Sequence, residues 1–228
     1  TLYFYSKSEK DIKFKKLYLP SDEEKDLQNY PYIEEETGRR YGLFDFTQNG
    51  PGDVRRFGDK ILEPPEGKHW IWSQEKIDEG IKNGIIVFTS SGTPRVKRYL
   101  DEKEGNPVND LWIDELVKPL SSNASERVNF QTQKPEALVK RILDATSDNG
   151  DIVLDFFLGS GTTTSVAQKL KRKWIGVEIG EYFWTIIIPR MKKVLFYDNT
   201  GISKEQDVRE KYNSNTAGGF FKYHTLEQ

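Results

Sequence analysis

Apolar side chains between residues 132 and 150 recur with the period of a helix. Thr132 is suited to cap this helix, and Pro135 falls in its first turn, where a missing N–H has no cost. Asn149-Gly150 supplies a stop signal. One face of the predicted helix carries Leu138, Ile142 and Ala145.

The residues that follow predict a strand, a turn, a helix and a second strand. The run Ile152-Val153-Leu154 is short and wholly apolar, as expected of a parallel strand buried on both faces. Gly159-Ser160-Gly161 turns the chain, residues 162–171 favour a helix, and Trp174-Ile175-Gly176-Val177 predicts the next strand. We expect the helix to bury Val166, Ala167 and Leu170. This βαβ unit predicts an α/β fold with a doubly wound, mostly parallel sheet.

The first hundred residues are less regular. An aromatic run at residues 1–6 predicts a strand, and Trp70 and Trp72 alternate on a strand-like segment that we expect in the core. Residues 21–40 carry seven acids and three bases, whereas residues 81–100 carry four bases and no acid. The formal charge of −2 for the whole chain therefore hides a segregated charge map.

Composition excludes several kinds of site. Cysteine is absent, which excludes disulfides, thiolate metal ligands and cysteine nucleophiles, and which fits a reducing compartment. The two histidines, His69 and His224, lie far apart, so we expect no metal site. The longest apolar runs, residues 152–158 and 184–189, are well short of the roughly 20 residues of a membrane span, so we expect no membrane partner. Because Thr1 opens directly on a strand-like run, we expect a piece of a longer protein.

The glycine turn is the strongest candidate for a binding site. It follows a strand of the predicted parallel sheet, which is where such sheets bind ligands. Gly159 and Gly161 allow a sharp turn and a ligand close to the main chain. The second strand ends at Glu178, 23 residues after Asp155, where a carboxylate suits the hydroxyls of a ribose. An adenosine-containing cofactor is therefore predicted.

The kind of cofactor depends on two further residues. A dinucleotide fingerprint has a third glycine where Thr164 stands. The Asp155 carboxylate repels phosphates but attracts the sulfonium and amino group of S-adenosylmethionine. These features favour S-adenosylmethionine over NAD.

Several blocks of the sequence resemble β-group DNA amino-methyltransferases. The cofactor-binding blocks are Thr132-Gln133-Lys134-Pro135, Val153 to Thr163 and Trp174 to Glu178. The double phenylalanine after Asp155 is typical of the modification (Mod) subunits of type III restriction–modification systems. So are residues 97–102, 111–114 and 218–223. The resemblance runs from about Arg39 to the end of the chain.

The resemblance implies a site-specific methyltransferase that transfers a methyl group from S-adenosyl-L-methionine to adenine N6 in double-stranded DNA. It implies a Rossmann-like fold with permuted motif order, incomplete at its N-terminus. Residues 1–28 would end the catalytic half of the sheet, 29–126 would form the target-recognition region, and 127–228 would bind the cofactor. The implied cofactor-binding residues are Thr132, Gln133, Lys134, Pro135, Asp155, Phe156, Phe157, Gly159, Ser160, Gly161, Thr162, Thr163 and Glu178.

The catalytic tetrapeptide of such enzymes, Asp-Pro-Pro-Tyr or a close variant, is not found. The nearest strings are Asn29-Tyr30-Pro31-Tyr32 and Glu63-Pro64-Pro65-Glu66. The first lacks proline at its second position and follows a polar run that is no strand, and the second lacks the aromatic residue. We therefore identify no catalytic residue and expect the tetrapeptide to precede Thr1. A non-catalytic DNA-specificity or assembly module and a cytosine-N4 methyltransferase remain alternatives.

The recognition region carries candidate phosphate contacts. The candidates are Arg39, Arg40, Arg95, Lys97 and Arg98, and the alternative is a solvated basic surface on which Tyr99 packs locally. The basic run at residues 169–173 is interpreted as an exposed helix end. The resemblance further implies another Mod subunit and a restriction (Res) subunit as partners, in the bacterial cytoplasm.

Overall fold

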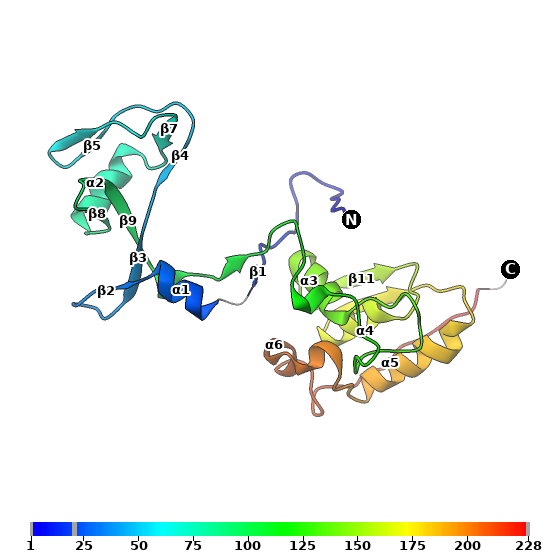
Figure 1. Cartoon of the computed structure of the whole chain (residues 1–228). Helices are drawn as coiled ribbons and strands as arrows, with labels where there is room; N and C mark the ends of the chain where they lie inside the picture. The colour runs from blue at the N-terminus through cyan, green and yellow to red at the C-terminus, as the bar shows by residue number, and fades with distance from the viewer. Residues whose placement is uncertain (1, 20–21, 227–228) are drawn as a thin grey trace. The chain divides into compact units, whose positions relative to one another are not determined.

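The computed structural model describes residues 2–19 and 22–226, and it divides into two compact units (Figure 1). One unit, the glycine-turn unit, consists of the described residues of 1–17 and 107–228, and the other, the central unit, of those of 18–106. Each unit has its own buried apolar cluster. By compactness, residues 107–126 therefore belong with the glycine-turn unit, while the functional division at residues 29–126 and 127–228 stays a prediction.

The central unit is built mainly from short antiparallel strands. Its largest sheet has the order β2-β3-β9-β8, and smaller sheets pair β4 with β7 and β5 with β6. The strands are β1 (Tyr18–Leu19), β2 (Tyr32–Ile33), β3 (Arg40–Phe44), β4 (Thr47–Asn49), β5 (Arg55–Phe57), β6 (Lys60–Leu62), β7 (Lys68–Trp70), β8 (Ile86–Phe88) and β9 (Pro94–Tyr99), and β1 pairs with β10 (Asn106–Pro107).

Helices α1 (Glu23–Asn29) and α2 (Gln74–Lys82) of the central unit begin at residues suited to cap them, and the short 3₁₀ turn η1 spans Leu100–Glu102. The Asp22 side chain accepts a hydrogen bond from the Lys25 amide, and Ser73 does the same for Lys76. The buried cluster consists of Phe46, Phe57, Trp70, Ile77, Ile86 and Val96. The predicted core position of Trp70 is confirmed, and the half-buried Trp72 packs against the same cluster.

The glycine-turn unit contains the predicted βαβ arrangement. Its elements are η2 (Glu115–Val117), α3 (Glu136–Thr146), β11 (Ile152–Asp155), α4 (Thr162–Lys169), β12 (Lys173–Gly176), the π-helical turn η3 (Phe183–Ile187), α5 (Ile188–Leu195), η4 (Gly201–Lys204) and α6 (Gln206–Arg209). Strands β11 and β12 pair in parallel, with Ile152 opposite Lys173 and Asp155 opposite Gly176. The predicted strand–turn–helix–strand order is therefore confirmed.

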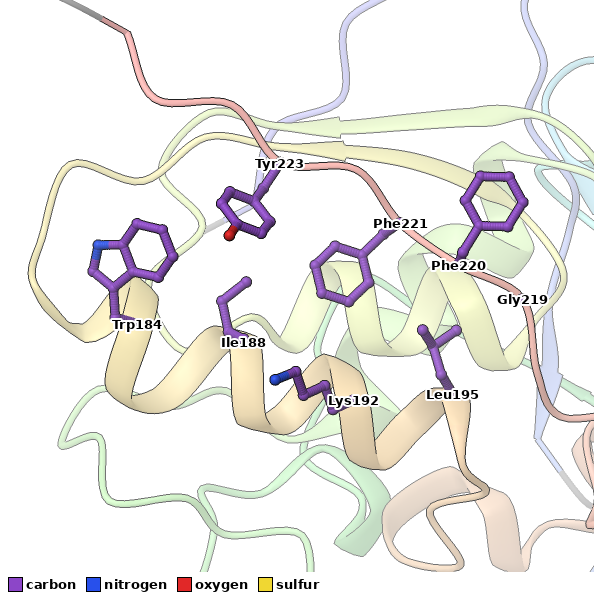
Figure 2. Close-up of a pocket in the computed structure, with 8 residues that line it drawn as sticks. All are labelled: Trp184, Ile188, Lys192, Leu195, Gly219, Phe220, Phe221 and Tyr223. Carbon is purple, nitrogen blue, oxygen red and sulfur yellow. The ribbon is translucent and has the colours of Figure 1, made fainter.

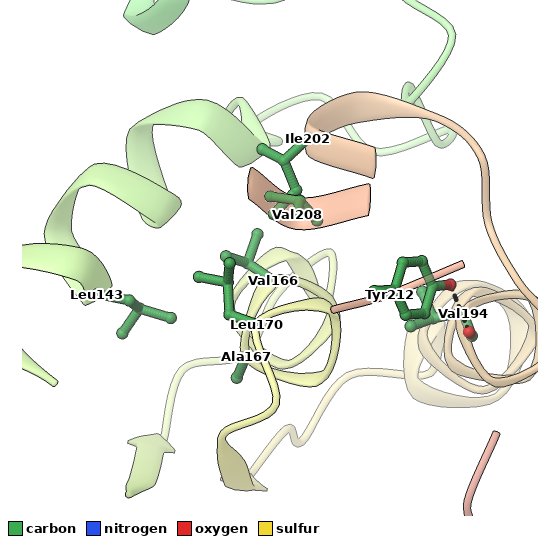
Figure 3. Packing of buried hydrophobic residues seen from close by; sticks show 8 residues of the cluster. All are labelled: Leu143, Val166, Ala167, Leu170, Val194, Ile202, Val208 and Tyr212. Atoms are coloured by element: carbon green, nitrogen blue, oxygen red, sulfur yellow. Dashed lines mark hydrogen bonds between the residues drawn. The ribbon is translucent and has the colours of Figure 1, made fainter. Parts of the chain in front are cut away.

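The core of this unit lies where α4 packs against α3 and α5 (Figure 3). Its members are Leu143, Val166, Ala167, Leu170, Val194, Ile202, Val208 and Tyr212. The predicted burial of Val166, Ala167 and Leu170 is confirmed. The Tyr212 hydroxyl donates to the Val194 carbonyl at 2.6 Å and accepts from the Asp198 amide at 2.7 Å, so the core keeps this polar atom paired.

Two strand predictions need correction. Residues 2–6 form no strand, because no described segment pairs with them and a strand needs such a partner. Strand β11 is buried on one face only: Val153 packs towards α4, whereas Ile152 and Leu154 are 66% and 57% exposed. Within the described residues the parallel sheet has two strands, and helices cover one of its faces.

Candidate cofactor site

The glycine turn begins where β11 ends and leads directly into α4. The Leu158 side chain turns inward, and its amide donates to the Val177 carbonyl at 3.1 Å. Gly159 and Gly161 have φ angles of 57° and 76°, which a residue with a Cβ atom rarely adopts. Gly161 also caps α4. The two glycines are therefore required by backbone geometry, as their position in the sequence predicted.

Glu178 lies directly beside this turn. One carboxylate oxygen accepts from the Gly159 amide at 2.7 Å, and the other accepts from the amides of Ile179 and Gly180, each at 2.9 Å. The Tyr182 hydroxyl bonds the same carboxylate. Burial acts to raise the pKa of Glu178, but these donors, Gly180 and Gly159 foremost, outweigh it and lower the pKa. Glu178 is thus held ionised at the end of β12.

Asp155 is the last residue of β11, at the start of the same turn, and its carboxylate is less constrained than that of Glu178. Its carboxylate accepts a hydrogen bond from the Phe157 amide at 3.0 Å. The Phe156 and Phe157 rings contact each other, with centroids 5.0 Å apart, and Phe157 is 83% exposed. A carboxylate offers about four acceptor positions, so Asp155 retains the capacity to bind a cationic group.

The segment Thr132–Pro135 reaches the turn through its backbone. The Thr162 hydroxyl is 3.4 Å from the Lys134 carbonyl oxygen, and a methyl group added at Gly159 would lie 3.5 Å from the Phe130 ring. Gln133 braces the preceding loop, since its amide group bonds the backbone of residues 126 and 128. The structure therefore brings the predicted segment and the turn together.

The start of the helix differs from the prediction. Helix α3 begins at Glu136 with Pro135 in the cap position, and Thr132 is exposed and does not cap it. The reason lies in Glu136 itself, whose amide donates to the Glu126 carboxylate at 3.0 Å. A distant acidic side chain thus replaces the local cap that the sequence offered.

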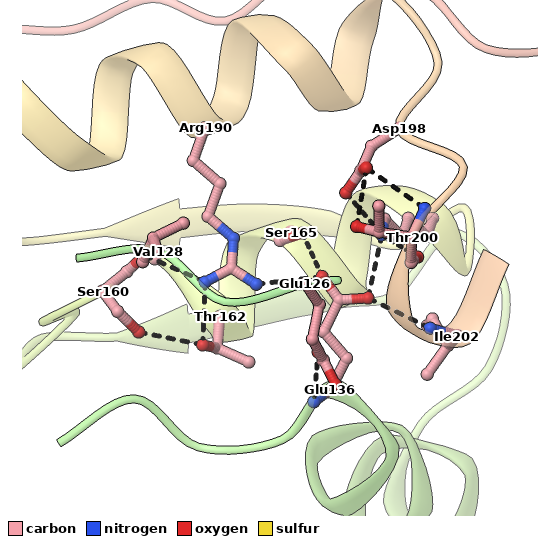
Figure 4. A network of polar contacts seen from close by, with 12 residues as sticks. Glu126, Val128, Glu136, Ser160, Thr162, Ser165, Arg190, Asp198, Thr200 and Ile202 are labelled. Carbon is pink, nitrogen blue, oxygen red and sulfur yellow. Dashed lines mark hydrogen bonds and ion pairs between the residues drawn. The ribbon is translucent and has the colours of Figure 1, made fainter. Parts of the chain in front are cut away.

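A buried ionic network lies beneath the turn (Figure 4). Glu136 accepts from Arg190 at 2.9 Å, from Lys169 at 2.8 Å and from the Ser165 hydroxyl at 2.9 Å. Lys169 also bonds Asp198 at 2.9 Å. Sequence reasoning missed this network. A signal existed, because Thr162, Ser165, Val166 and Lys169 share the i, i+3, i+4, i+7 spacing of one buried helix face.

The interpretation of residues 169–173 as an exposed basic helix end is wrong for two of them. Lys169 is fully buried in the network just described. Arg172 is also buried, and it donates to the carbonyl oxygens of Leu170 and Ser147 at 2.9 and 3.0 Å. Buried cations need such partners, and Ser147 for Arg172, like Glu136 and Asp198 for Lys169, comes from a segment distant in sequence.

The network shifts the pKa values of Asp198 and Glu126 in opposite directions. Burial raises the pKa of Asp198, but Lys169 above all outweighs this and brings the pKa to about 2. Burial, with the nearby Glu136 charge, raises the pKa of Glu126. The low pKa of Asp198 therefore depends on Lys169, whereas the raised pKa of Glu126 follows first from burial and then from Glu136.

The candidate DNA contacts lie in the central unit, and most of them are paired with carboxylates of that unit. Arg39 forms a bidentate pair with Asp101 at 2.8 and 2.7 Å, and Lys97 pairs with Glu34 at 3.0 Å. Arg95 lies 3.8 Å from an Asp45 carboxylate oxygen. Tyr99 is buried beneath Arg39, which stacks 3.8 Å above its ring. This local pairing and packing agree with the alternative of a solvated surface for these three cations.

Arg40 and Arg98 differ from the other three candidates. Arg40 donates to the Tyr30 carbonyl at 3.1 Å. Arg98 is exposed, lies 5.2 Å from the centre of the Phe44 ring, and pairs with no carboxylate among the described residues. Of the five predicted contacts, Arg98 is the one whose charge is most available to a phosphate.

The glycine-turn unit also has a groove of about 430 Å³ (Figure 2). It runs between α5 and the chain segment 219–223, and its lining residues are Trp184, Ile188, Lys192, Leu195, Gly219, Phe220, Phe221 and Tyr223. None of them is a predicted site residue.

Within the described residues, no group of three or more His, Asp or Glu side chains is placed to hold a metal ion, and no helix is long and apolar enough to cross a membrane.

Comparison with known proteins identifies related sequences. A family model described as DNA methylase, covering N6 and N4 methyltransferases, matches residues 1–189. The probable type III restriction-modification enzyme HindVI Mod subunit of Haemophilus influenzae is 38% identical over 172 residues, which are 69% of this chain and 22% of that protein. The DNA adenine methyltransferase YhdJ of Escherichia coli is 34% identical over 130 residues, 54% of this chain and 43% of YhdJ. The chain spans less than half the length of these curated relatives.

Among solved structures, the crystal structure of an M1.HpyAVI-SAM complex is 22% identical and covers 51% of this chain and 68% of that chain. Its TM-score is 0.32.

Proposed function

Because this chain belongs to the family of N6- and N4-specific DNA methylases, we propose that it is part of a site-specific methyltransferase that acts on adenine N6 in double-stranded DNA. The adenine assignment is supported by the relative named a DNA adenine methyltransferase. The finer fold proposal is a Rossmann-like sheet with permuted motif order. It is supported by the parallel β11–α4–β12 unit, which follows the proposed recognition region in sequence.

The observation that carries the proposal is the hydrogen bond between the glycine turn and the Glu178 carboxylate. The Gly159 amide and the Glu178 carboxylate are 2.7 Å apart, at the carboxyl ends of two adjacent parallel strands. Ligands bind to open parallel sheets at this edge. Two carboxylates, Asp155 and Glu178, flank a turn with close access to backbone, and no phosphate-binding third glycine is present. This set of groups fits a cofactor that has a ribose and a positive charge.

S-adenosyl-L-methionine has both features, and the residues present fit it. Bound there, it supplies an electrophilic methyl group on a sulfonium. Glu178 would hold the ribose hydroxyls, and the turn from Asp155 to Thr163 together with Thr132–Pro135 would hold the remainder. Because the Glu178 oxygens already accept three backbone amides and the Tyr182 hydroxyl, a ribose hydroxyl has to replace the tyrosine. The protein's contribution is therefore positioning, and methyl transfer to an amine requires no metal.

The target base has to leave the duplex, since its amino group is out of reach within the stack. No Asp-Pro-Pro-Tyr string occurs among the 228 residues, so we expect this chain alone to bind cofactor and to methylate little.

Arg98 is the first candidate for a phosphate contact, followed by Arg40. The other three candidates are already paired with carboxylates of the central unit. To contact DNA, the side chains of Arg39, Arg95 and Lys97 would have to leave these carboxylates and bind phosphates instead. Another Mod subunit and a Res subunit are proposed partners, supported by the similarity to a type III Mod subunit.

Calorimetric titration of the chain with S-adenosyl-L-methionine tests the proposal. Asp155→Asn removes the charge but keeps an oxygen for the Phe157 amide, and we expect it to weaken binding roughly tenfold, because hydrogen bonds to charged groups are the strong ones. Asp151→Asn is the matched control, since Asp151 lies at the opposite end of the same strand and pairs with Lys13. Equal affinities of the wild type and Asp155→Asn would remove the site assignment.

A further inference from the structure

The Arg190 side chain of α5 forms hydrogen bonds to the glycine turn from the buried side. One guanidinium nitrogen donates to the Ser160 carbonyl at 3.1 Å and to the Thr162 hydroxyl at 3.0 Å. The other donates to Glu136 at 2.9 Å. The side chain is 4% exposed, so it reaches the turn only from the interior. Its planar fork thus bonds two positions of the turn and the first residue of α3 at once.

Glu136 has little freedom to move. Its carboxylate is fully buried and accepts from Ser165, from Lys169 and, at 3.2 Å, from the Ile202 amide, in addition to Arg190. A methyl group added at Gly201 would lie 2.3 Å from one of its oxygens, which shows how closely the chain packs there. Because the acceptor is fixed on all sides, the guanidinium that it holds is fixed as well (Figure 4).

The fixed guanidinium determines where two parts of the candidate cofactor site lie relative to each other. The Thr162 hydroxyl that Arg190 bonds is also 2.9 Å from the Ser160 hydroxyl and 3.4 Å from the Lys134 carbonyl. Glu136 itself directly follows Thr132–Pro135 in the chain. The polar groups that join the turn to this segment therefore converge on one ion pair.

We infer that Arg190 and Glu136 are positioning residues, which hold the glycine turn and the segment Thr132–Pro135 in the arrangement that binds S-adenosylmethionine. The inference rests on the proposed function. Both side chains are buried, so they act through Ser160 and Thr162 and do not touch the cofactor. A purely structural ion pair would stabilise the fold without favouring one conformation of the turn, and this difference can be measured.

The experiment compares Arg190→Met with Arg172→Met. Arg172 is a matched control: its side chain is 6% exposed and it donates to two backbone carbonyls, those of Leu170 and Ser147, outside the turn. Both variants remove a buried guanidinium from the same unit, so both should lower the temperature of unfolding. At a temperature where both are folded, we expect Arg190→Met to bind S-adenosylmethionine at least roughly tenfold more weakly, and Arg172→Met to stay within about twofold of the wild type.

Amide hydrogen exchange supplies a readout that requires no ligand. Arg190→Met should accelerate exchange at Gly159 and Gly161, whose amides bond Glu178 and the Leu158 carbonyl, whereas Arg172→Met should leave these two amides unchanged. Arg190→Lys is the second variant if Arg190→Met does not fold. Lysine retains the charge but lacks the fork, so an intermediate loss of affinity, about threefold, is expected.

The outcomes separate the inference from the proposed function. If the wild type binds the cofactor and the Arg190 variants match the Arg172 variant in affinity and exchange, the inference is overturned and the proposed function stands. If the wild type does not bind S-adenosylmethionine, the proposed function fails and the inference fails with it. Weaker binding with faster exchange at the turn, confined to the Arg190 variants, supports both.

Discussion

The two compact units treat their charged side chains in opposite ways. In the glycine-turn unit, Glu136, Lys169, Arg190 and Asp198 are buried and bonded to one another. In the central unit, the pairs of Arg39 with Asp101 and of Lys97 with Glu34 keep contact with solvent. Asp26, which pairs with Lys103, is an exception, since its side chain is 5% exposed.

The difference follows from the cost of removing a charge from water. A buried charge has to be paired and hydrogen-bonded, so its neighbours have one permitted geometry. A surface pair contributes little, and either partner can be exchanged for another ion. A cofactor turn benefits from the first arrangement because it has to be formed before the ligand arrives. A surface that contacts phosphates benefits from the second, because its cations can leave their own carboxylates.

The largest effect is expected from removing one lysine in each unit. Lys169→Met leaves Glu136 and Asp198 buried with one cation fewer, and should lower the free energy of unfolding of the glycine-turn unit by about 3–5 kcal/mol. Lys97→Met removes a solvent-accessible pair and should change that of the central unit by about 1 kcal/mol or less. Hydrogen exchange followed separately in the two units measures both values. Equal effects would show that the contrast between the units has no energetic meaning.

Acid titration should distinguish the same two classes of pair. The pKa of Asp198 is about 2 in the folded protein against an ordinary value of 3.8, so its ionised form stabilises the fold above about pH 4, and this stability is lost as the pH falls from 4 to 2. The shift corresponds to about 2 kcal/mol. Urea unfolding of Asp198→Asn should therefore differ from wild type by about that amount at pH 7 and converge with it near pH 2. Asp101→Asn, at a surface pair, should show little dependence; a similar acid profile for both variants would contradict this account.

DNA binding tests the exchangeable surface of the central unit. Arg98→Ala should weaken binding of duplex DNA roughly fivefold and reduce the slope of log affinity against log salt by about 1, since its charge has no competing carboxylate among the described residues. Arg39→Ala should have a smaller effect, because Arg39 is already paired with Asp101 and Glu102. Fluorescence anisotropy over a range of salt concentrations measures both. A larger loss for Arg39→Ala would reverse the proposed order of contacts.

The smallest expected effect concerns Tyr182, whose hydroxyl occupies one acceptor position of Glu178. Tyr182→Phe removes a donor that a ribose has to replace, so it should tighten binding of S-adenosylmethionine by about threefold. Tyr99→Phe removes a comparable tyrosine–glutamate bond, of 2.9 Å to Glu34, from the central unit and should leave this affinity unchanged. Calorimetry on both variants checks the prediction. Weaker binding by Tyr182→Phe would mean that the hydroxyl contacts the cofactor directly.

The parts of the fold that local patterns determine were predictable. The apolar runs of β11 and β12, the positive φ of Gly159 and Gly161, and the buried face of α4 depend on neighbours in the sequence. The residues that meet at the turn were predictable for the same reason, because strand ends of a parallel unit lie at one edge. Their role in binding stays a prediction.

What could not be predicted depends on partners distant in the chain. Lys169 has the polarity of a surface residue, and its burial is decided by Glu136 and Asp198, which are 33 and 29 residues away. Arg39 was interpreted as a phosphate contact, but it bonds the carboxylates of Asp101 and Glu102, which are 62 and 63 residues away. The predicted strand at residues 1–6 is absent from residues 2–6 for the same reason, and residue 1 lies outside the described residues. An aromatic run indicates a strand but does not supply the strand it pairs with.

Cofactor binding is proposed for the turn between β11 and α4, with S-adenosylmethionine as the ligand. The most direct test is to titrate the ¹⁵N-labelled chain with S-adenosylmethionine and to follow amide chemical shifts in both units. We expect the largest saturating shifts at Gly159, Ser160, Gly161 and the residues around Glu178, with the central unit unchanged. Saturating shifts confined to the central unit, or no shifts at millimolar cofactor, would contradict it.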